Sequence, residues 1–188
     1  FIALAEDITN QAMQTLWAKI LVGETLSPGT FSIKSLQTLK QMTQKEANAL
    51  QKCAPLCGFV EHEGSYLIML GYYKKPSFFD LLRKGNKESI NLAQSGLSFP
   101  NILTLMDIGL MYRKEIESPS LKQGQSFSLS FQSKKLTLTA KSNELVLSYY
   151  KLTQTGEELK RLITAPVNSQ YKQLLEQAML EEFTCEWS

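Results

Sequence analysis

Histidine and cysteine are scarce in this chain of 188 residues, which contains a single histidine, His62, and three cysteines. Cys53, Cys57 and Cys185 are too few for a disulfide scaffold, and their number fits a reducing compartment. Cys53 and Cys57 would share one helix face, but a structural zinc site requires four Cys or His ligands. We therefore expect no metal site and no cofactor, and we interpret these two thiols as small buried apolar side chains.

Sequence motifs of enzymes are also missing. The chain has no Gly-rich phosphate loop, no nucleophile elbow and no HExxH motif. With His62 as the only imidazole, a general base would have to be a carboxylate or a lysine. Asp7, Asp80 and Asp107 are the only aspartates, and none has a carboxylate partner at a suitable spacing. We predict that the chain has no catalytic residues and is not an enzyme, unless folding brings two distant carboxylates together.

Long apolar segments are absent as well. Residues 66–70 form one of the longest apolar runs, whereas a membrane-spanning helix needs about 20 such residues. The first ten residues contain Glu6 and Asp7 and show neither the basic nor the apolar part of a signal peptide. These features predict a cytoplasmic protein without a membrane segment. Because the chain begins with Phe1, we interpret it as a fragment whose N-terminal region precedes this sequence.

The composition is otherwise that of a folded protein. Apolar residues make up 43% of the chain and aromatic residues 10%, which is sufficient for a substantial core. Lys and Arg number 20 against 18 Asp and Glu, for a net charge of +2. This charge is far too small to indicate a nucleic-acid-binding protein by itself. The length fits one domain or two small domains that share an interface.

Residues 1–96 predict a mainly helical unit with a short hairpin. Apolar side chains recur at intervals of three and four over residues 3–22, and Gly23 is placed to end this helix. Thr43 and Glu46 have the spacing of a capping box at the start of a later helix. Beyond it, weak alternation on both sides of Glu63 and Gly64 predicts two short strands joined by a turn.

Residues 97–188 predict helices that flank a small antiparallel sheet. Pro100 marks the first turn of a helix, and alternating apolar residues then indicate strands near 127–131, 136–139 and 145–149. Short polar turns, QSKK and AKSNE, separate these strands. The fold class is therefore α+β, in which an N-terminal helical unit precedes the sheet and its flanking helices.

Two helices are predicted after the last strand. Thr155 and Glu158 have the spacing of a second capping box, and apolar residues follow at helical intervals. A final amphipathic helix is expected over residues 167–183.

Three segments of the sequence, LWAKILVGE, PGTFSIKSLQTLKQMTQKEA and LMDIGLM, resemble an uncharacterised bacterial family of unknown function. The first two are also similar to part of some abortive-infection-type phage-defence proteins. The resemblance is close over about the first sixty residues and implies no catalytic residue. It implies an N-terminal segment before this region, and it makes a component of a phage-defence protein one alternative function.

The C-terminal half is similar to winged-helix proteins in the order of its elements. NILTLMDIGLM stands where such proteins have a recognition helix, and YKLTQTGEELKRL enters a capped helix with a glycine where space is short. Residues 110–165 contain nine Lys or Arg and five acids, a net charge of +4. The candidate phosphate contacts are Arg113, Lys114, Lys134 and Lys135. The candidate recognition helix itself contains no Lys, Arg or Gln, which argues against readout of bases.

These observations favour a non-catalytic interaction or regulatory domain, with a winged-helix-like nucleic-acid-binding domain as the alternative. Aromatic residues are common anchors of protein interfaces. The candidate interface residues are Trp17, Tyr72, Tyr73, Phe78, Phe79 and Trp187. The competing interpretation is that these side chains fill a larger core. We expect a protein partner or a homodimer, and nucleic acid is the second class of partner.

Overall fold

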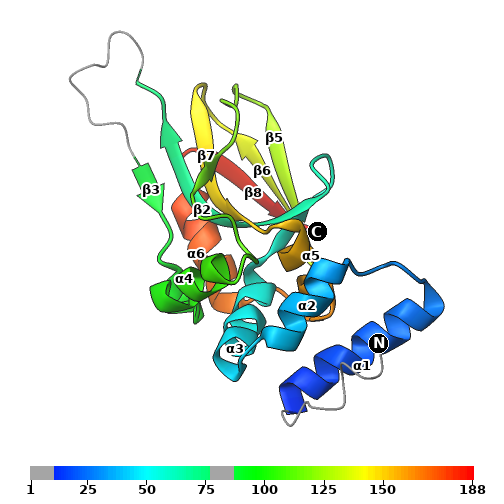
Figure 1. Ribbon diagram of the computed structural model, residues 1–188. Helices are drawn as coiled ribbons and strands as arrows, with labels where there is room; N and C mark the ends of the chain where they lie inside the picture. Colours follow the sequence, from blue (N-terminus) through cyan, green and yellow to red (C-terminus); the bar gives the residue numbers. More distant parts are fainter. Residues whose placement is uncertain (1–10, 77–86) are drawn as a thin grey trace.

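A computed structural model describes residues 11–76 and 87–188, and this part of the chain forms six α-helices and one eight-stranded sheet (Figure 1). The helices are α1 (Gln11–Leu26), α2 (Ile33–Gln41), α3 (Gln44–Cys53), α4 (Phe99–Asp107), α5 (Gln154–Arg161) and α6 (Ser169–Met179). The strands are β1 (Gly58–Val60), β2 (Ser65–Lys74), β3 (Lys87–Ser89), β4 (Ile116–Glu117), β5 (Ser126–Ser130), β6 (Lys135–Ala140), β7 (Leu145–Lys151) and β8 (Phe183–Trp187). The predicted α+β class is confirmed.

All strand pairs of the sheet are antiparallel, and the order is β4-β7-β2-β1-β5-β6-β8 with β3 beside β2. The predicted hairpin at Gly64 is confirmed, because β1 and β2 pair across this turn. Gly64 has a φ of 61°, a left-handed conformation that glycine adopts without strain. The turn between β5 and β6 also joins neighbouring strands.

The segment between β6 and β7 is not a hairpin turn, although its sequence predicted a turn between two strands. β6 pairs with β5 and β8, whereas β7 pairs with β2 and β4. Residues 141–144 therefore carry the chain from one part of the sheet to another. As a result, β1 and β2 from the first half of the chain pair with β5 and β7 from the second half. The sheet crosses the boundary that the sequence placed between residues 96 and 97.

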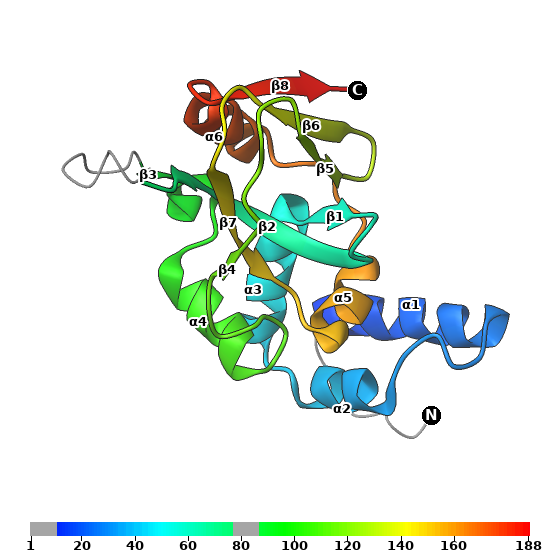
Figure 2. The same ribbon diagram turned by 90° about the horizontal axis from the view of Figure 1, so that it is seen from above.

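The N-terminal helices pack at one end of the sheet. α1 extends to Leu26, so Gly23 lies within the helix rather than at its end. The capping box at the start of α3 is confirmed, since the Thr43 side chain accepts from Glu46 N–H and the Glu46 carboxylate accepts from Thr43 N–H. Figure 2 shows α1, α2, α3 and α5 grouped together, with β8 and α6 farther from α2. Among the described residues, no helix combines the length and the apolar character that crossing a membrane requires.

The second predicted capping box is wrong in its details. The N-cap of α5 is Thr153, whose side chain accepts from Gly156 N–H, while Thr155 is buried inside the helix. The chain turns earlier than predicted because Thr153 is also held by Leu110 and Gly109. Thr153 N–H donates to the Leu110 carbonyl at 3.0 Å, and its hydroxyl donates to the Gly109 carbonyl at 2.6 Å.

The last predicted helix is shorter than expected. α6 ends at Met179, and Phe183 begins β8, which pairs with β6 along the edge of the sheet. α6 is fixed to the sheet by Tyr171, whose buried hydroxyl donates to the Met69 carbonyl at 2.9 Å. The register of β2 against β7 shifts between Met69 and Gly71, so this bond lies at the irregular point of the strand.

Candidate functional site

The aromatic residues proposed for an interface occupy different environments. Trp17 and Tyr72 are 2% and 0% exposed and belong to the core, so they offer almost no surface to a partner. Tyr73 is half-buried, and its hydroxyl donates to the Glu117 carboxylate at 2.8 Å. Trp187 is half-buried on the edge strand β8. Phe78 and Phe79 lie outside the described residues.

The basic residues proposed as phosphate contacts fall into two separate groups. Arg113 and Lys114 are exposed between α4 and β4, and the Arg113 guanidinium lies 3.6 Å from the Asp107 carboxylate. Lys134 ends the turn between β5 and β6, and Lys135 is the first residue of β6. The structure does not bring these two groups together, because β4 and β5 occupy different positions in the sheet.

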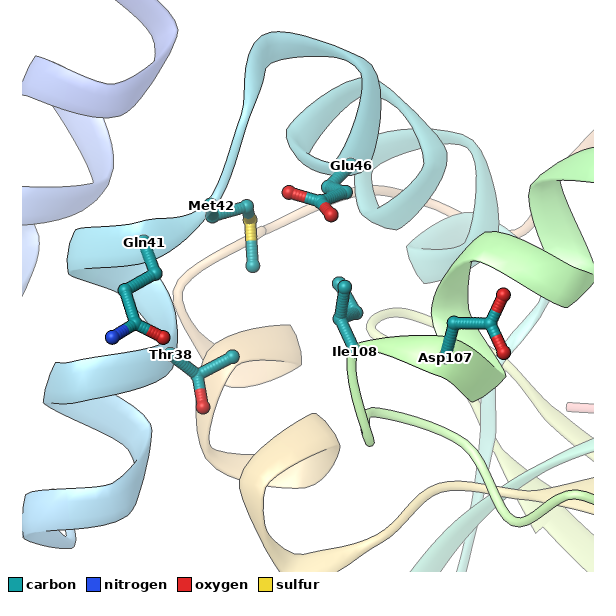
Figure 3. A pocket seen from close by; sticks show the side chains of 6 residues that line it. All are labelled: Thr38, Gln41, Met42, Glu46, Asp107 and Ile108. Carbon is teal, nitrogen blue, oxygen red and sulfur yellow. The ribbon is translucent and has the colours of Figure 1, made fainter.

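One hollow in the surface lies between α2, α3 and the end of α4 (Figure 3). It has a volume of about 360 Å³ and is lined by Thr38, Gln41, Met42, Glu46, Asp107 and Ile108. Both of its acids have structural partners, because Glu46 completes the capping box of α3 and Asp107 faces Arg113. No group of three metal-ligating side chains occurs in the described ranges. This hollow is therefore explained by the packing of the helices.

A second hollow has the opposite charge, and we call it the basic hollow. It has a volume of about 340 Å³ and lies between the β1–β2 hairpin, the β5–β6 turn and the end of α5. Its main lining residues are Phe59, Tyr66, Phe131, Lys160 and Arg161, with residues 163–165 at its rim. None of the described residues that line it is acidic.

The strand register places the aromatic rings of the basic hollow. Phe59 is paired with Tyr66 across the hairpin, so both side chains project from the same face of the sheet, and their centroids are 5.0 Å apart. Gly58 leaves the space that Phe131 occupies. A Cβ at Gly58 would lie 3.2 Å from the Phe131 ring and 3.0 Å from the Leu129 side chain.

The cations of the basic hollow come from the last turn of α5. Lys160 Nζ lies 4.2 Å from the centroid of the Tyr66 ring, a cation–π arrangement. Desolvation lowers the pKa of Lys160, and the neighbouring Arg161 guanidinium lowers it further. Desolvation also raises the pKa of Tyr66, an effect that the nearby Arg161 opposes. The hollow thus contains two adjacent cations, one of which has lost part of its hydration.

Two carboxylates approach the basic hollow without lining it. Glu157 accepts from Tyr66 N–H at 3.3 Å, and desolvation raises the pKa of its carboxyl group. Glu61 accepts from the Ser130 hydroxyl at 3.4 Å. Each carboxylate is therefore engaged with a neighbouring donor beside the hollow.

The aromatic lining continues beyond the hollow toward the edge of the sheet. The centroid of Phe131 lies 5.7 Å from that of Trp187 on β8, with the ring planes tilted by 36°. Lys172 Nζ of α6 lies 4.9 Å from the centroid of the Trp187 ring. We call Tyr66, Phe59, Phe131 and Trp187 the aromatic row. All four side chains are half-buried, and each comes from a different strand or turn.

The sequence analysis identified Trp187 of this row but none of the residues that line the hollow itself. Phe59 and Tyr66 lie at equal distances from the turn of a correctly predicted hairpin, so their pairing was available from the sequence. Their proximity to Lys160 and Arg161 was not predictable from the sequence, because these two residues of α5 lie more than 90 residues farther along the chain.

His62 lies on the surface in the turn between β1 and β2. Its side chain is 70% exposed, and its Nε2 lies 4.0 Å from the Glu63 carboxylate. That carboxylate is also bound by Lys151 Nζ at 2.8 Å. The imidazole therefore faces solvent, and it does not line either of the two hollows.

Comparison with known proteins identifies a family. A family model described as "Protein of unknown function (DUF2806)" matches residues 1–176. No curated protein and no solved structure matches this chain. The match confirms the resemblance to a family of unknown function.

Proposed function

The chain belongs to this family of unknown function, and we propose that the protein is a non-catalytic binding domain that holds an anionic partner in the basic hollow. The observation that carries the proposal is the pair of adjacent cations, Lys160 and Arg161, in a hollow with no acidic lining residue among those described. The volume of about 340 Å³ lies within the range of small-ligand sites, which is about 300–1,000 Å³.

Desolvation of Lys160 supports an anionic partner. A cation that has lost part of its hydration gains more from a nearby anion than a fully solvated one does. Two unit charges 4 Å apart interact by about 4 kcal/mol near a protein surface, compared with about 1 kcal/mol in bulk water. An anion in the hollow would therefore restore interactions that Lys160 lost on folding, and it would also attract Arg161.

The same surroundings support binding without catalysis. The described residues that line the basic hollow include no His, Cys, Asp or Glu, and the lysine among them, Lys160, lies over the Tyr66 ring. The adjacent carboxylates Glu61 and Glu157 accept hydrogen bonds from Ser130 and from Tyr66 N–H. His62 is exposed in a turn. We therefore propose no reaction for this site.

A protein partner or a homodimer has less in its favour. That hypothesis depended on a surplus of exposed aromatic side chains, but Trp17 and Tyr72 are buried in the core. Tyr73 and Trp187 are half-buried, and Trp187 belongs to the aromatic row. Within residues 11–76 and 87–188, no structural feature favours the phage-defence alternative.

Binding of a fluorescent heparin fragment, used as a sulfated probe, tests the proposal by anisotropy. We expect Arg161→Ala to weaken binding about tenfold, because one charge-assisted contact is lost. The matched control is Arg113→Ala, which removes the same charge from an exposed residue that does not line the hollow. It should change the affinity by less than about twofold.

Both variants should be measured at about 50 mM and about 200 mM salt, since a charge-driven complex weakens as salt rises. Equal losses of affinity for the heparin fragment in the two variants would mean that diffuse surface charge binds the probe. The assignment of the site to the basic hollow would then be wrong. An absence of binding at low salt would remove the proposal altogether.

A further inference from the structure

We infer that the anionic partner is a single-stranded nucleic acid whose bases stack on the aromatic rings of the basic hollow, Phe59, Tyr66 and Phe131; this inference depends on the proposed function. Proteins that bind single strands combine cations that follow the phosphates with aromatic rings on which bases stack. Both components are present in the basic hollow, where Lys160 and Arg161 lie among aromatic rings.

The aromatic row consists of two pairs of rings. Phe59 and Tyr66 share one face of the sheet, whereas the register of β8 against β6 places Trp187 on the other face. Tyr66 and Phe59 form one neighbouring pair of rings, with centroids 5.0 Å apart. Phe131 and Trp187 form a second pair, with centroids 5.7 Å apart. Phe59, Tyr66 and Phe131 also line the basic hollow, so these rings face an open space rather than the closed core.

Cations lie beside both pairs of rings. Lys160 Nζ lies over Tyr66 at 4.2 Å, and Lys172 Nζ, which is also 3.7 Å from the Glu176 carboxylate, lies over Trp187 at 4.9 Å. Lys134 of the β5–β6 turn and Lys135 at the start of β6 are two of the phosphate contacts expected from the sequence. A strand that enters the hollow would thus meet Lys160 and Arg161 beside its aromatic rings, with no acid among the described lining residues.

The remaining polar groups of the hollow fit base edges of any sequence. Gln132 presents an amide with both donors and acceptors, and Thr164 presents a hydroxyl group, while the Ser130 hydroxyl donates to Glu61 and is left as an acceptor. Such groups can adapt to different bases, so we expect little sequence preference.

The rings favour a single strand over other polyanions. In a duplex the bases stack on each other, and their faces reach a protein only after a base is unstacked at a cost of a few kcal/mol. A sulfated polysaccharide or an acidic peptide would use the cations, but it lacks the flat unpaired bases that stack on aromatic rings. Unpaired bases use both components.

Fluorescence anisotropy with labelled oligo(dT), oligo(rU), a duplex of equal length and the heparin fragment tests this inference on the 188-residue chain. We expect both single strands to bind more tightly than the duplex. Phe131→Leu, which keeps an apolar side chain but removes the ring, should weaken oligonucleotide binding about fivefold to a hundredfold. Its affinity for heparin should stay within about twofold of the original value, because the cations are intact.

Two further variants serve as controls. Phe131→Tyr keeps an aromatic ring and should retain oligonucleotide affinity, which separates stacking from damage to the fold. Tyr112→Leu removes an exposed ring that does not line the hollow and should have no effect. A comparison of oligo(dT) with oligo(rU) shows whether DNA or RNA is preferred.

The outcomes distinguish this inference from the proposed function. If Phe131→Leu weakens the binding of heparin and of oligonucleotides equally, or weakens neither, the stacking inference is overturned. The proposed anion site is tested separately, by the effect of Arg161→Ala on heparin binding. If the duplex binds as tightly as the single strands, the inference also fails. Selective loss of single-strand binding in Phe131→Leu supports it.

Discussion

At the scale of single residues, glycine 156 shows how closely the chain is packed around α5. A Cβ at this position would lie 1.9 Å from the Leu110 carbonyl oxygen, far inside contact distance. The obstacle is backbone rather than a flexible side chain, so it cannot move aside without displacing the segment before β4. The sequence analysis expected a glycine where space is short at this point, and the close approach confirms it.

Gly156→Ala should therefore lower the free energy of unfolding by about 3 kcal/mol or more, because the added methyl group forces the backbones apart. Chemical denaturation followed by circular dichroism measures the change. Gly23→Ala is the matched control, since it adds the same group to a helix. There the methyl meets only the Phe31 ring, at 3.1 Å. Its effect should stay within about 1 kcal/mol, and an equally tolerated Gly156→Ala would contradict the packing described.

The burial of individual aromatic residues was not predictable from the sequence. Trp17 and Tyr72 belong to segments whose apolar pattern was recognised, but the pattern does not tell whether a large ring faces the core or a partner. Cys53 and Cys57 were easier to interpret, because a small apolar side chain without metal-binding neighbours fits only a core. Both are buried, with their sulfur atoms 3.6 Å apart.

At the scale of elements, Glu158 joins two helices that are distant in the sequence. Its carboxylate lies in α5 and accepts from Ser32 N–H at the N-cap of α2, at 2.7 Å, and from the Gln154 amide at 3.0 Å. Desolvation opposes its ionisation. Hydrogen bonds from Ser35, Ser32 and Gln154 outweigh this effect, so the pKa of Glu158 is lowered from its ordinary value. The sequence analysis assigned Glu158 to the cap of its own helix, because a contact with the distant helix α2 is not apparent from the local sequence.

Glu158→Gln should lower the free energy of unfolding by about 1–3 kcal/mol at neutral pH, since a charged acceptor for the Ser32 N–H is lost. Because the folded-state pKa is lowered, this stabilisation is complete above the unfolded pKa of about 4.3 and disappears as the pH falls through the folded value. The difference in stability between the two proteins should therefore be smaller at about pH 3 than at about pH 7, as measured by denaturation curves.

Glu157→Gln is the control for this comparison. Desolvation raises the pKa of Glu157, so ionisation of this group opposes folding as the pH rises. Its replacement should cost less stability at neutral pH than Glu158→Gln does. A difference between Glu158→Gln and the unchanged protein that stays constant down to acidic pH would show that the carboxylate is not the stabilising group.

Most elements were predictable because their signals are local. The capping box of α3, the proline in the first turn of α4, the β1–β2 hairpin and the alternation in β5 and β6 are each contained within a few residues. β8 was missed because it begins only four residues after the last residue of an amphipathic helix, and Phe183 continues the apolar spacing of that helix. Only pairing with β6, about 45 residues earlier, makes this segment a strand.

At the scale of the whole molecule, the sheet joins the two halves of the chain. β2 pairs with β7 over seven positions, from Leu67 with Lys151 to Lys74 with Leu145. The connected core likewise contains Trp17 of α1 and Phe183 of β8. A division of the chain between residues 96 and 97 would cut through both the sheet and the core.

We therefore expect the protein to unfold in one cooperative transition. Urea denaturation should give the same midpoint by circular dichroism, which follows the helices and strands, and by tryptophan fluorescence. The two tryptophans, Trp17 and Trp187, lie in α1 and β8 and report on both halves of the chain. Two separated midpoints would mean that residues 1–96 and 97–188 fold as independent units.

The candidate site also depends on the whole fold, because its residues come from segments that are distant in the sequence. This is why the sequence did not reveal it. The basic hollow collects side chains from β1, β2, the β5–β6 turn and α5. No local pattern connects these segments. The sequence supplied the lysines of the turn and Trp187 as separate candidates, and only the order of strands in the sheet places them near each other.

The way in which Lys160 and Lys172 are held has a consequence for recognition. Each ammonium group lies over an aromatic face, and that of Lys172 is also 3.7 Å from the Glu176 carboxylate. The Tyr66 ring therefore helps to position the Lys160 ammonium group without supplying an opposite unit charge. A preorganised cation gives up less entropy on association than a mobile one does, so Lys160 would add more to the affinity of the anionic partner proposed above than a free surface lysine.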